Sequence, residues 1–370
     1  VAALTFGLVM TESRAGWVSA GALGALFLWR AKRSWGLGGW RTVVAWWALL
    51  TLMAVTWKPL NEALLLTSTR AGSLSELARD SPRLSIWKQM IAAVEQAPWL
   101  GYGWRQTAVA QKVGADFVAG ATPTDYAHSV ILDVLLWLGI PMGLLALLLV
   151  AWWLLRAAWR IESSTQFLLV ASALPVCIHS LVEFPFAYAY FLFPVGWMLS
   201  ATSALQNTSQ RETWRLPQRT GRTALAGFVV AFAGMCGWVA VEYVQAEEDH
   251  RVMRFEMRKV GRTPVGYEAP HLVLLNQLGE MLQLARLEPR PDMSPKELER
   301  MRVANASFEW ATLHLHYAVA LGLNGQPEEA SRQLSNLRAL YGMSSYEQAV
   351  AYFQELQNMK YSQLASVKMP

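Results

Sequence analysis

Long apolar stretches separated by short polar connectors constrain the fold of this chain most strongly. They span 15–29, 42–57, 129–155, 166–182, 184–204 and 223–241. A helix needs ~20 apolar residues to cross a bilayer, and these stretches lie near that length. With 54% hydrophobic residues, 18 Trp and only 16% charged residues, the chain has the composition of a membrane protein. We therefore predict an all-α fold, a polytopic helical membrane protein.

The basic residues of alternate connectors predict the orientation of these helices. They are Arg30, Lys32, Arg33 and Arg41, then Arg156 and Arg160, then Arg211, Arg215, Arg219 and Arg222. Because cytoplasmic loops carry an excess of Lys and Arg, one topology places all of these connectors in the cytoplasm. The opposite, periplasmic side then receives Arg14, a large loop of about 58–128, the turn at 179–183 and everything after 244. The basic surplus is explained by topology, and we predict no binding of nucleic acid.

We predict two domains, a transmembrane catalytic domain over 1–244 and a periplasmic helical domain over 245–370. In the second domain, Ser294 and Glu297 form the pattern of a capping box. The segment 308–323, a turn at Asn324 and Gly325, and a second apolar-periodic segment resemble one tetratricopeptide-like hairpin. A plain helical bundle is the alternative, and in both cases the segments 256–287 and 346–356 are expected to stack on the hairpin. Since the sequence opens at Val1 inside an apolar helix, we expect a longer protein with further N-terminal helices.

His128 is the most informative single residue. It stands directly before the apolar stretch 129–155, with Asp125 before it and Asp133 after it. A histidine beside carboxylates at a helix mouth is suited to accept a proton from a hydroxyl nucleophile. The alternative is a polar residue at the membrane interface with no chemical role.

Two arginines and a second polar pair are expected on the same side. Arg14 ends one apolar helix, and Arg83 begins an amphipathic segment; guanidinium groups suit an anionic substrate, although both could serve only the membrane interface. His179 and Glu183 are spaced i,i+4, which places both on one helix face if the helix continues. They are either a structural pair or a second part of the site.

Other motifs are weaker. Gly101 and Gly103 could let backbone amides approach a phosphate. His314 and His316 are spaced i,i+2 and point to different helix faces, so we predict no metal site there. The sequence lacks the common zinc, nucleotide-binding and hydrolase motifs, and we predict neither a metal nor a cofactor.

A series of short motifs in a fixed order resembles a known family. They are Ser13-Arg14-Ala15-Gly16, Arg83-x-x-x-Trp87, Pro98-x-x-Gly101-x-Gly103, Ala127-His128-Ser129 and Leu138-Gly139-Ile140-Pro141-Met142-Gly143. This series resembles the bacterial O-antigen ligase superfamily, which includes related O-antigen polymerases. The stretch 179–185 and the C-terminal extension look like its protein O-oligosaccharyltransferase branch, which acts on pilins. One departure is Ser129, where many relatives have Asn.

The resemblance implies metal-independent transfer of a preassembled glycan from undecaprenyl diphosphate to an acceptor hydroxyl, at the periplasmic face of the bacterial inner membrane. In that reaction Arg14 and Arg83 would bind the diphosphate and His128 would be the catalytic base. His179 and Glu183 would be second-tier residues that position the acceptor.

Three functions remain open from the sequence. The preferred acceptor is a Ser or Thr hydroxyl of a periplasmic protein such as pilin, and the alternative is lipid A core, as in an O-antigen ligase. From a different class, the chain could be a non-catalytic transporter or assembly scaffold. That function predicts polar residues deep within several spans, yet Asp133 is nearly the only charge inside one.

Overall fold

A computed structural model describes residues 2–10, 13–31, 36, 39–64, 82–120, 122–206, 218–257, 267–308 and 310–370. All regular structure in these residues is helical, which confirms the predicted all-α class. The chain forms two compact units. The N-terminal unit comprises 1–114 and 124–211, and the C-terminal unit comprises 115–123 and 212–370.

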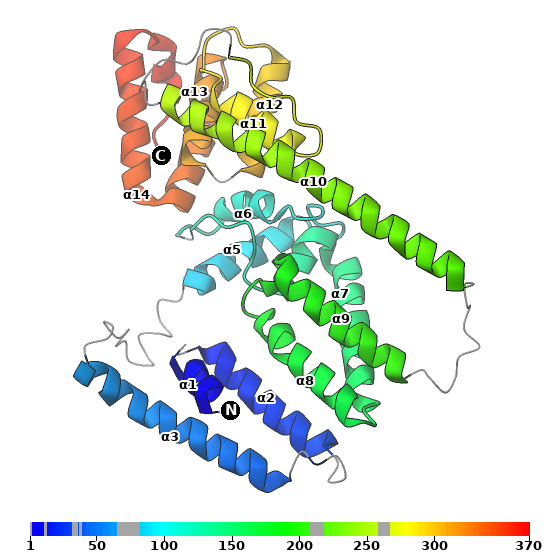
Figure 1. Cartoon of the computed structure of the whole chain (residues 1–370). Helices are drawn as coiled ribbons and strands as arrows, with labels where there is room; N and C mark the ends of the chain where they lie inside the picture. The colour runs from blue at the N-terminus through cyan, green and yellow to red at the C-terminus, as the bar shows by residue number, and fades with distance from the viewer. Residues whose placement is uncertain are drawn as a thin grey trace. The chain divides into compact units, whose positions relative to one another are not determined.

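The helices of the N-terminal unit cover all five predicted apolar stretches of this unit and include further helices outside them (Figure 1). They are α1 (Ala2–Met10), α2 (Arg14–Arg30), α3 (Trp40–Leu64), α5 (Pro82–Gln96), α6 (Thr107–Ala115), α7 (Val130–Trp159), α8 (Ser164–His179), the short 3-10 helix η2 (Pro185–Ala187) and α9 (Ala189–Gln206). Among the described residues of the whole chain, three helices are long and apolar enough to cross a membrane: 40–61, 130–159 and 219–256. The other three predicted spans form the shorter helices α2, α8 and α9.

The predicted topology is only partly covered by the described residues. Lys32, Arg33, Arg211 and Arg215 lie outside them, as do 65–81 of the predicted loop. Helix α3 continues through the predicted start of that loop to Leu64. The multi-pass topology and the periplasmic location of the loop therefore stay predictions.

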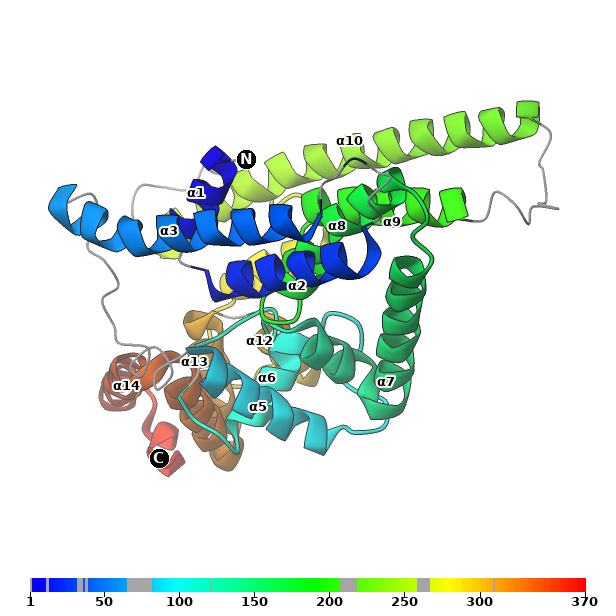
Figure 2. The same cartoon turned by 90° about the horizontal axis from the view of Figure 1, so that it is seen from below.

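Aromatic residues hold the first helices together. Helix α1 packs on α3, and α2 lies beside α3 and packs on α8 (Figures 1 and 2). The Trp46 indole N–H donates to the Thr5 hydroxyl at 3.1 Å. The rings of Trp17 and Trp47 lie 6.2 Å apart, and Leu50 is fully buried between these helices. Van der Waals contact between such large side chains stabilises this packing, also where lipid surrounds the helices.

Helix α7 bends at Gly139, and the bend locks the loop that leads to His128. Gly139 has φ 73° and ψ 174°, a conformation that only glycine adopts without strain. A β-carbon there would lie 2.4 Å from the Trp99 carbonyl oxygen, and one on Gly101 would lie 2.4 Å from the Leu136 oxygen. Because the two backbones touch, larger residues are excluded at both glycines.

The same contact corrects the proposed phosphate role of Gly101 and Gly103. The amide of Gly103 donates to the Trp137 carbonyl at 3.1 Å, and the amide of the intervening Tyr102 donates to Leu136 at 2.7 Å. These N–H groups are already paired, so the glycine motif attaches the loop to α7 and presents no free amide there to a phosphate.

The C-terminal unit contains α10 (Gln218–Met257), α11 (Asn276–Ala285), α12 (Pro295–Ser307), α13 (Ala311–Leu323), α14 (Pro327–Met359) and the 3-10 helix η3 (Ser362–Ser366). Residue 244, the predicted domain boundary, lies inside the continuous helix α10. That boundary stays a prediction. The segment 115–123 also belongs to this unit, where Gly120 N–H donates to the Ala339 carbonyl at 3.1 Å.

The predicted hairpin forms from α13 and α14 (Figure 1). Gly325 has φ 77°, and Gln326 N–H donates back to Leu321 at 2.9 Å, so the turn ends α13 sharply. Phe353 of α14 is fully buried against α13, which confirms that the segment 346–356 stacks on the hairpin. The capping box of Ser294 and Glu297 is also present. Whether the hairpin is tetratricopeptide-like stays a prediction.

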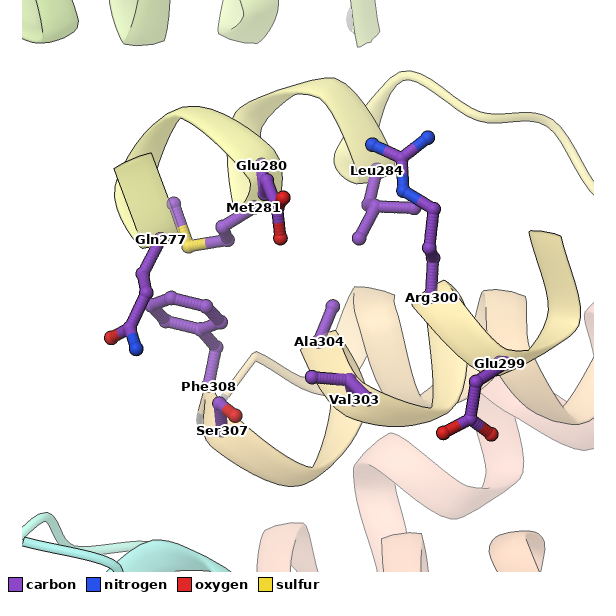
Figure 3. A pocket seen from close by; sticks show the side chains of 10 residues that line it. All are labelled: Gln277, Glu280, Met281, Leu284, Glu299, Arg300, Val303, Ala304, Ser307 and Phe308. Atoms are coloured by element: carbon purple, nitrogen blue, oxygen red, sulfur yellow. The ribbon is translucent and has the colours of Figure 1, made fainter. Parts of the chain in front are cut away.

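A pocket of about 230 Å³ lies between α11 and α12 of the C-terminal unit (Figure 3). Its lining combines apolar side chains with three charged ones. They are Met281, Leu284, Val303 and Phe308, with Glu280, Glu299 and Arg300. In Figure 3 the Phe308 ring lies below Met281, and the Arg300 side chain extends from α12 toward Leu284.

Candidate active site

His128 lies at the end of the loop, one residue before the N-cap of α7. Its backbone has φ 52°, in the left-handed region that a histidine adopts only when its surroundings hold it there. The ring nitrogen Nδ1 is 2.8 Å from Oε2 of Glu183, and the His128 side chain is 23% exposed. With Nδ1 facing a carboxylate, the other ring nitrogen, Nε2, is left for a substrate.

Glu183 joins His128 to Arg83. Its second oxygen, Oε1, accepts a hydrogen bond from the Arg83 guanidinium. The Arg83 side chain is 47% exposed, and only one of its five N–H groups is needed for this bond. The carboxylate therefore orients the imidazole while the guanidinium remains able to bind an anion.

Local structure explains how these residues meet. Arg83 is in the first turn of α5, and Glu183 follows the last residue of α8 by four positions. Glu183 N–H still donates to the His179 carbonyl at 2.9 Å, which fixes the turn that presents its side chain. Residues 100 and 55 positions apart in the sequence are thereby connected through one carboxylate.

Aromatic rings surround the histidine. The Phe184 ring meets the His128 ring edge-on at 4.6 Å, and Tyr126 stacks on Phe184 at 5.3 Å. The Arg105 guanidinium lies over Tyr126, 5.5 Å from the ring centroid. Burial raises the pKa of the Tyr126 phenol, which therefore stays neutral at ordinary pH although Arg105 opposes the shift. Arg105 is a second guanidinium near the site that sequence reasoning missed.

The structure brings some of the predicted site residues together and not others. The structure brings together Arg83, His128 and Glu183. Arg14 begins α2, but its side chain lies outside the described residues, so its role stays a prediction. Helix α8 ends at His179, so the condition under which His179 and Glu183 would share a helix face is not met.

Within the described residues, the His179 ring makes no hydrogen bond, and its role in positioning an acceptor stays a prediction. The nearby carboxylates Asp125 and Asp133 also differ from expectation. Asp125 is exposed, and Asp133 is buried and bonds to the backbone at Ala127 rather than to the His128 ring. The carboxylate partner of His128 comes instead from distant Glu183.

No group of three His, Cys, Asp or Glu side chains that could hold a metal ion occurs in the part of the chain that the structure describes. The prediction of a metal-independent reaction is not tested by this observation. The contacts that Glu183 makes with Arg83 and with His128 suit proton transfer beside an anion-binding group.

The sequence of the chain matches the models of two known protein families. The family model described as "Virulence factor membrane-bound polymerase, C-terminal" matches residues 167–355, about half of the chain, and the model described as "O-Antigen ligase" matches residues 1–147. No solved structure matches the chain.

Two curated relatives come from Acinetobacter baylyi. The ComP-specific O-oligosaccharyltransferase is 29% identical over 245 residues, which are 64% of this chain and 42% of the relative. The General O-oligosaccharyltransferase is 29% identical over 268 residues, 70% of this chain and 44% of the relative. The chain thus spans less than half the length of these relatives. Both family models confirm the resemblance predicted from the motifs: the chain belongs to the family of virulence-factor membrane-bound polymerases, within the O-antigen ligase superfamily.

Proposed function

We propose that this protein is an O-oligosaccharyltransferase that moves a preassembled glycan from undecaprenyl diphosphate to a Ser or Thr hydroxyl of a periplasmic protein such as a pilin. The observation that carries the proposal is the linkage of Arg83 to His128 through Glu183. An anion-binding group, Arg83, and a proton acceptor, His128, both contact the Glu183 carboxylate. The names of the two curated relatives support protein as the acceptor class.

In the proposed reaction, Nε2 of His128 takes the proton of the acceptor hydroxyl as that oxygen attacks the anomeric carbon of the glycan. The new C–O bond forms as the bond from that carbon to the diphosphate oxygen breaks, and the electron pair leaves on the diphosphate. Glu183 stabilises the imidazolium that results, because its carboxylate contacts Nδ1. The free N–H groups of Arg83, with Arg14, stabilise the charge that develops on the leaving diphosphate.

Transfer to lipid A core, the reaction of an O-antigen ligase, uses the same chemistry and differs only in the acceptor. The match of the O-antigen ligase model to residues 1–147 keeps this candidate open. A transport or scaffold function is less favoured, because Asp133 is fully buried and hydrogen-bonded, as a structural group would be, and does not line a pathway. For either transferase, we place the active face at the periplasmic side of the bacterial inner membrane.

The test is an in vitro transfer assay with lipid-linked oligosaccharide as donor, in which purified pilin and lipid A core are offered side by side. We expect glycan on pilin, detected by its mass, and none on lipid A core. The His128→Ala variant should insert in the membrane and lose transfer to both acceptors. Full activity of this variant would refute the proposed role of His128, and transfer to lipid A core alone would make the protein a ligase.

A further inference from the structure

Asp133 is a buried carboxylate that the proposed reaction does not use. It lies in the first turn of α7 and is fully buried. The Ala127 amide donates to both of its oxygens, at 3.0 and 3.2 Å, and the Thr107 hydroxyl donates to one of them at 2.7 Å. Every one of these partners donates a hydrogen, so the arrangement suits an ionised carboxylate, which only accepts.

Thr107 is itself fixed by an indole. The Trp137 Nε1–H donates to the Thr107 hydroxyl oxygen at 2.8 Å. An indole N–H can only donate, so the single hydroxyl proton of Thr107 is free to point at Asp133. The three side chains therefore form a chain of hydrogen bonds with one direction, from Trp137 through Thr107 to Asp133.

The backbone carbonyl of Ala127 also accepts a hydrogen bond. The Trp87 indole N–H donates to the Ala127 oxygen at 2.9 Å, so both backbone polar groups of this residue are bound by side chains. Ala127 is fully buried. After His128, the Val130 amide donates to the Ser180 carbonyl at 2.9 Å, so the chain is fixed on both sides of the histidine.

Such fixing is needed because His128 is in the left-handed conformation, which a non-glycine residue leaves when nothing restrains it. We propose that Asp133 is a positioning residue, which holds the Ala127–His128 segment so that Nδ1 meets Glu183 and Nε2 faces the acceptor hydroxyl. Asp133 does not touch the substrate; it acts through the backbone. The inference rests on the proposed function.

The first test is the Asp133→Asn variant of the whole protein, assayed with lipid-linked oligosaccharide and pilin. The NH2 group of the asparagine donates and cannot accept, and it would replace the oxygen that accepts from Ala127 at 3.2 Å, so the histidine should lose its fixed position. We expect kcat to fall by about 100-fold while the KM values for donor and acceptor change little, since misplacing a catalytic group costs rate rather than binding.

A second pair of variants serves if Asp133→Asn does not accumulate in the membrane. Thr107→Val keeps the shape of the side chain and removes the hydroxyl, and Thr107→Ser keeps the hydroxyl. We expect the valine variant to show a reduced kcat and the serine variant to recover most of it. Thr202→Val is the matched control, since Thr202 is equally buried but its hydroxyl bonds only to the Met198 carbonyl of its own helix.

The outcomes separate the two proposals. If the wild-type protein transfers no glycan, the proposed function fails. If the wild type is active and His128→Ala keeps full transfer, the proposed role of His128 fails, and the inference fails with it. If His128→Ala is inactive while Asp133→Asn keeps the wild-type kcat, only the positioning role is refuted. Equal rates for Thr107→Val and Thr107→Ser would refute it in the same way, because the hydroxyl would then have no effect on the histidine.

Discussion

Each unit holds a carboxylate against an arginine, and the two arrangements differ in what they leave available. In the C-terminal unit, Asp249 is buried, and Arg286 donates to its two oxygens at 2.7 and 3.0 Å while remaining only 21% exposed. In the N-terminal unit, Glu183 is shared between His128 and an Arg83 side chain that is 47% exposed. The first is a closed cross-link, and the second is a site that can still bind a ligand.

A further carboxylate of the C-terminal unit follows the closed pattern. Glu242 is 3% exposed and accepts from the amides of Val273, Leu274 and Leu275 at 2.8 to 2.9 Å. The Trp238 indole donates to it at 2.8 Å. These bonds attach the start of α11 to α10. All four of these N–H groups donate to Glu242, so none of them is left for a substrate. Burial of a carboxylate therefore does not identify a site; Glu183 differs because it contacts a histidine as well as an exposed arginine.

The comparison predicts its largest effect at Glu183. In Glu183→Gln, the amide cannot stabilise an imidazolium or hold Nδ1 of His128 in one tautomer, so kcat should fall by about 10³-fold. Transfer kinetics with lipid-linked oligosaccharide and pilin measure this. Glu95→Gln, at an exposed position on α5, is the control and should keep the wild-type rate. A rate for Glu183→Gln close to that control would mean that the carboxylate has only a structural role.

The closed cross-link should respond in stability and not in chemistry. Arg286→Met leaves Asp249 buried without its cation, which should lower the free energy of unfolding by about 3 kcal/mol. Thermal unfolding of the whole protein in detergent measures the loss, and kcat per folded molecule should not change. Arg251→Met is the control, because its pair with Glu248 is exposed, and no measurable loss is expected. A large fall in kcat with Arg286→Met would contradict the distinction between the two units.

Most helices could be predicted from the sequence, because apolar runs and caps are local signals. The capping box at Ser294 and the turn at Gly325 formed as predicted. The bend of α7 could not be predicted, since an apolar run around Gly139 and Pro141 reads as one straight span. The bend depends on the close approach of the Trp99 backbone, which is a tertiary contact.

The site residues likewise differ in whether the sequence could reveal them. His128 and Arg83 stand out locally, at a helix mouth and at the start of an amphipathic segment. The sequence favoured Asp125 and Asp133 as partners of the histidine because they are near in sequence. Glu183 takes that place because the end of α8 returns to the loop, which no spacing along the chain reveals. The positioning role proposed for Asp133 likewise depends on hydrogen bonds from distant Thr107 and Ala127.

A smaller effect is expected when the exposed arginine is altered conservatively. Arg83→Lys keeps the charge but loses the forked donors that match a diphosphate, so the KM for the lipid-linked donor should rise about tenfold with a smaller change in kcat. Steady-state kinetics at varied donor concentration measure it. Arg160→Lys, an exposed arginine directly after α7, is the control and should leave the donor KM unchanged. An unchanged donor KM for Arg83→Lys would show that Arg83 only orients Glu183.

The smallest effect distinguishes a histidine of the C-terminal unit from His128. Burial lowers the pKa of His316 below its usual value, although Glu288 opposes the shift. The unfolded chain therefore binds this proton more readily than the folded one, so stability is full above the unfolded pKa of about 6.5 and falls as pH drops through it. Unfolding midpoints measured across this range should decline less in His316→Gln than in the wild type. Equal declines would show that other groups cause the acid sensitivity, because a glutamine cannot take up the proton.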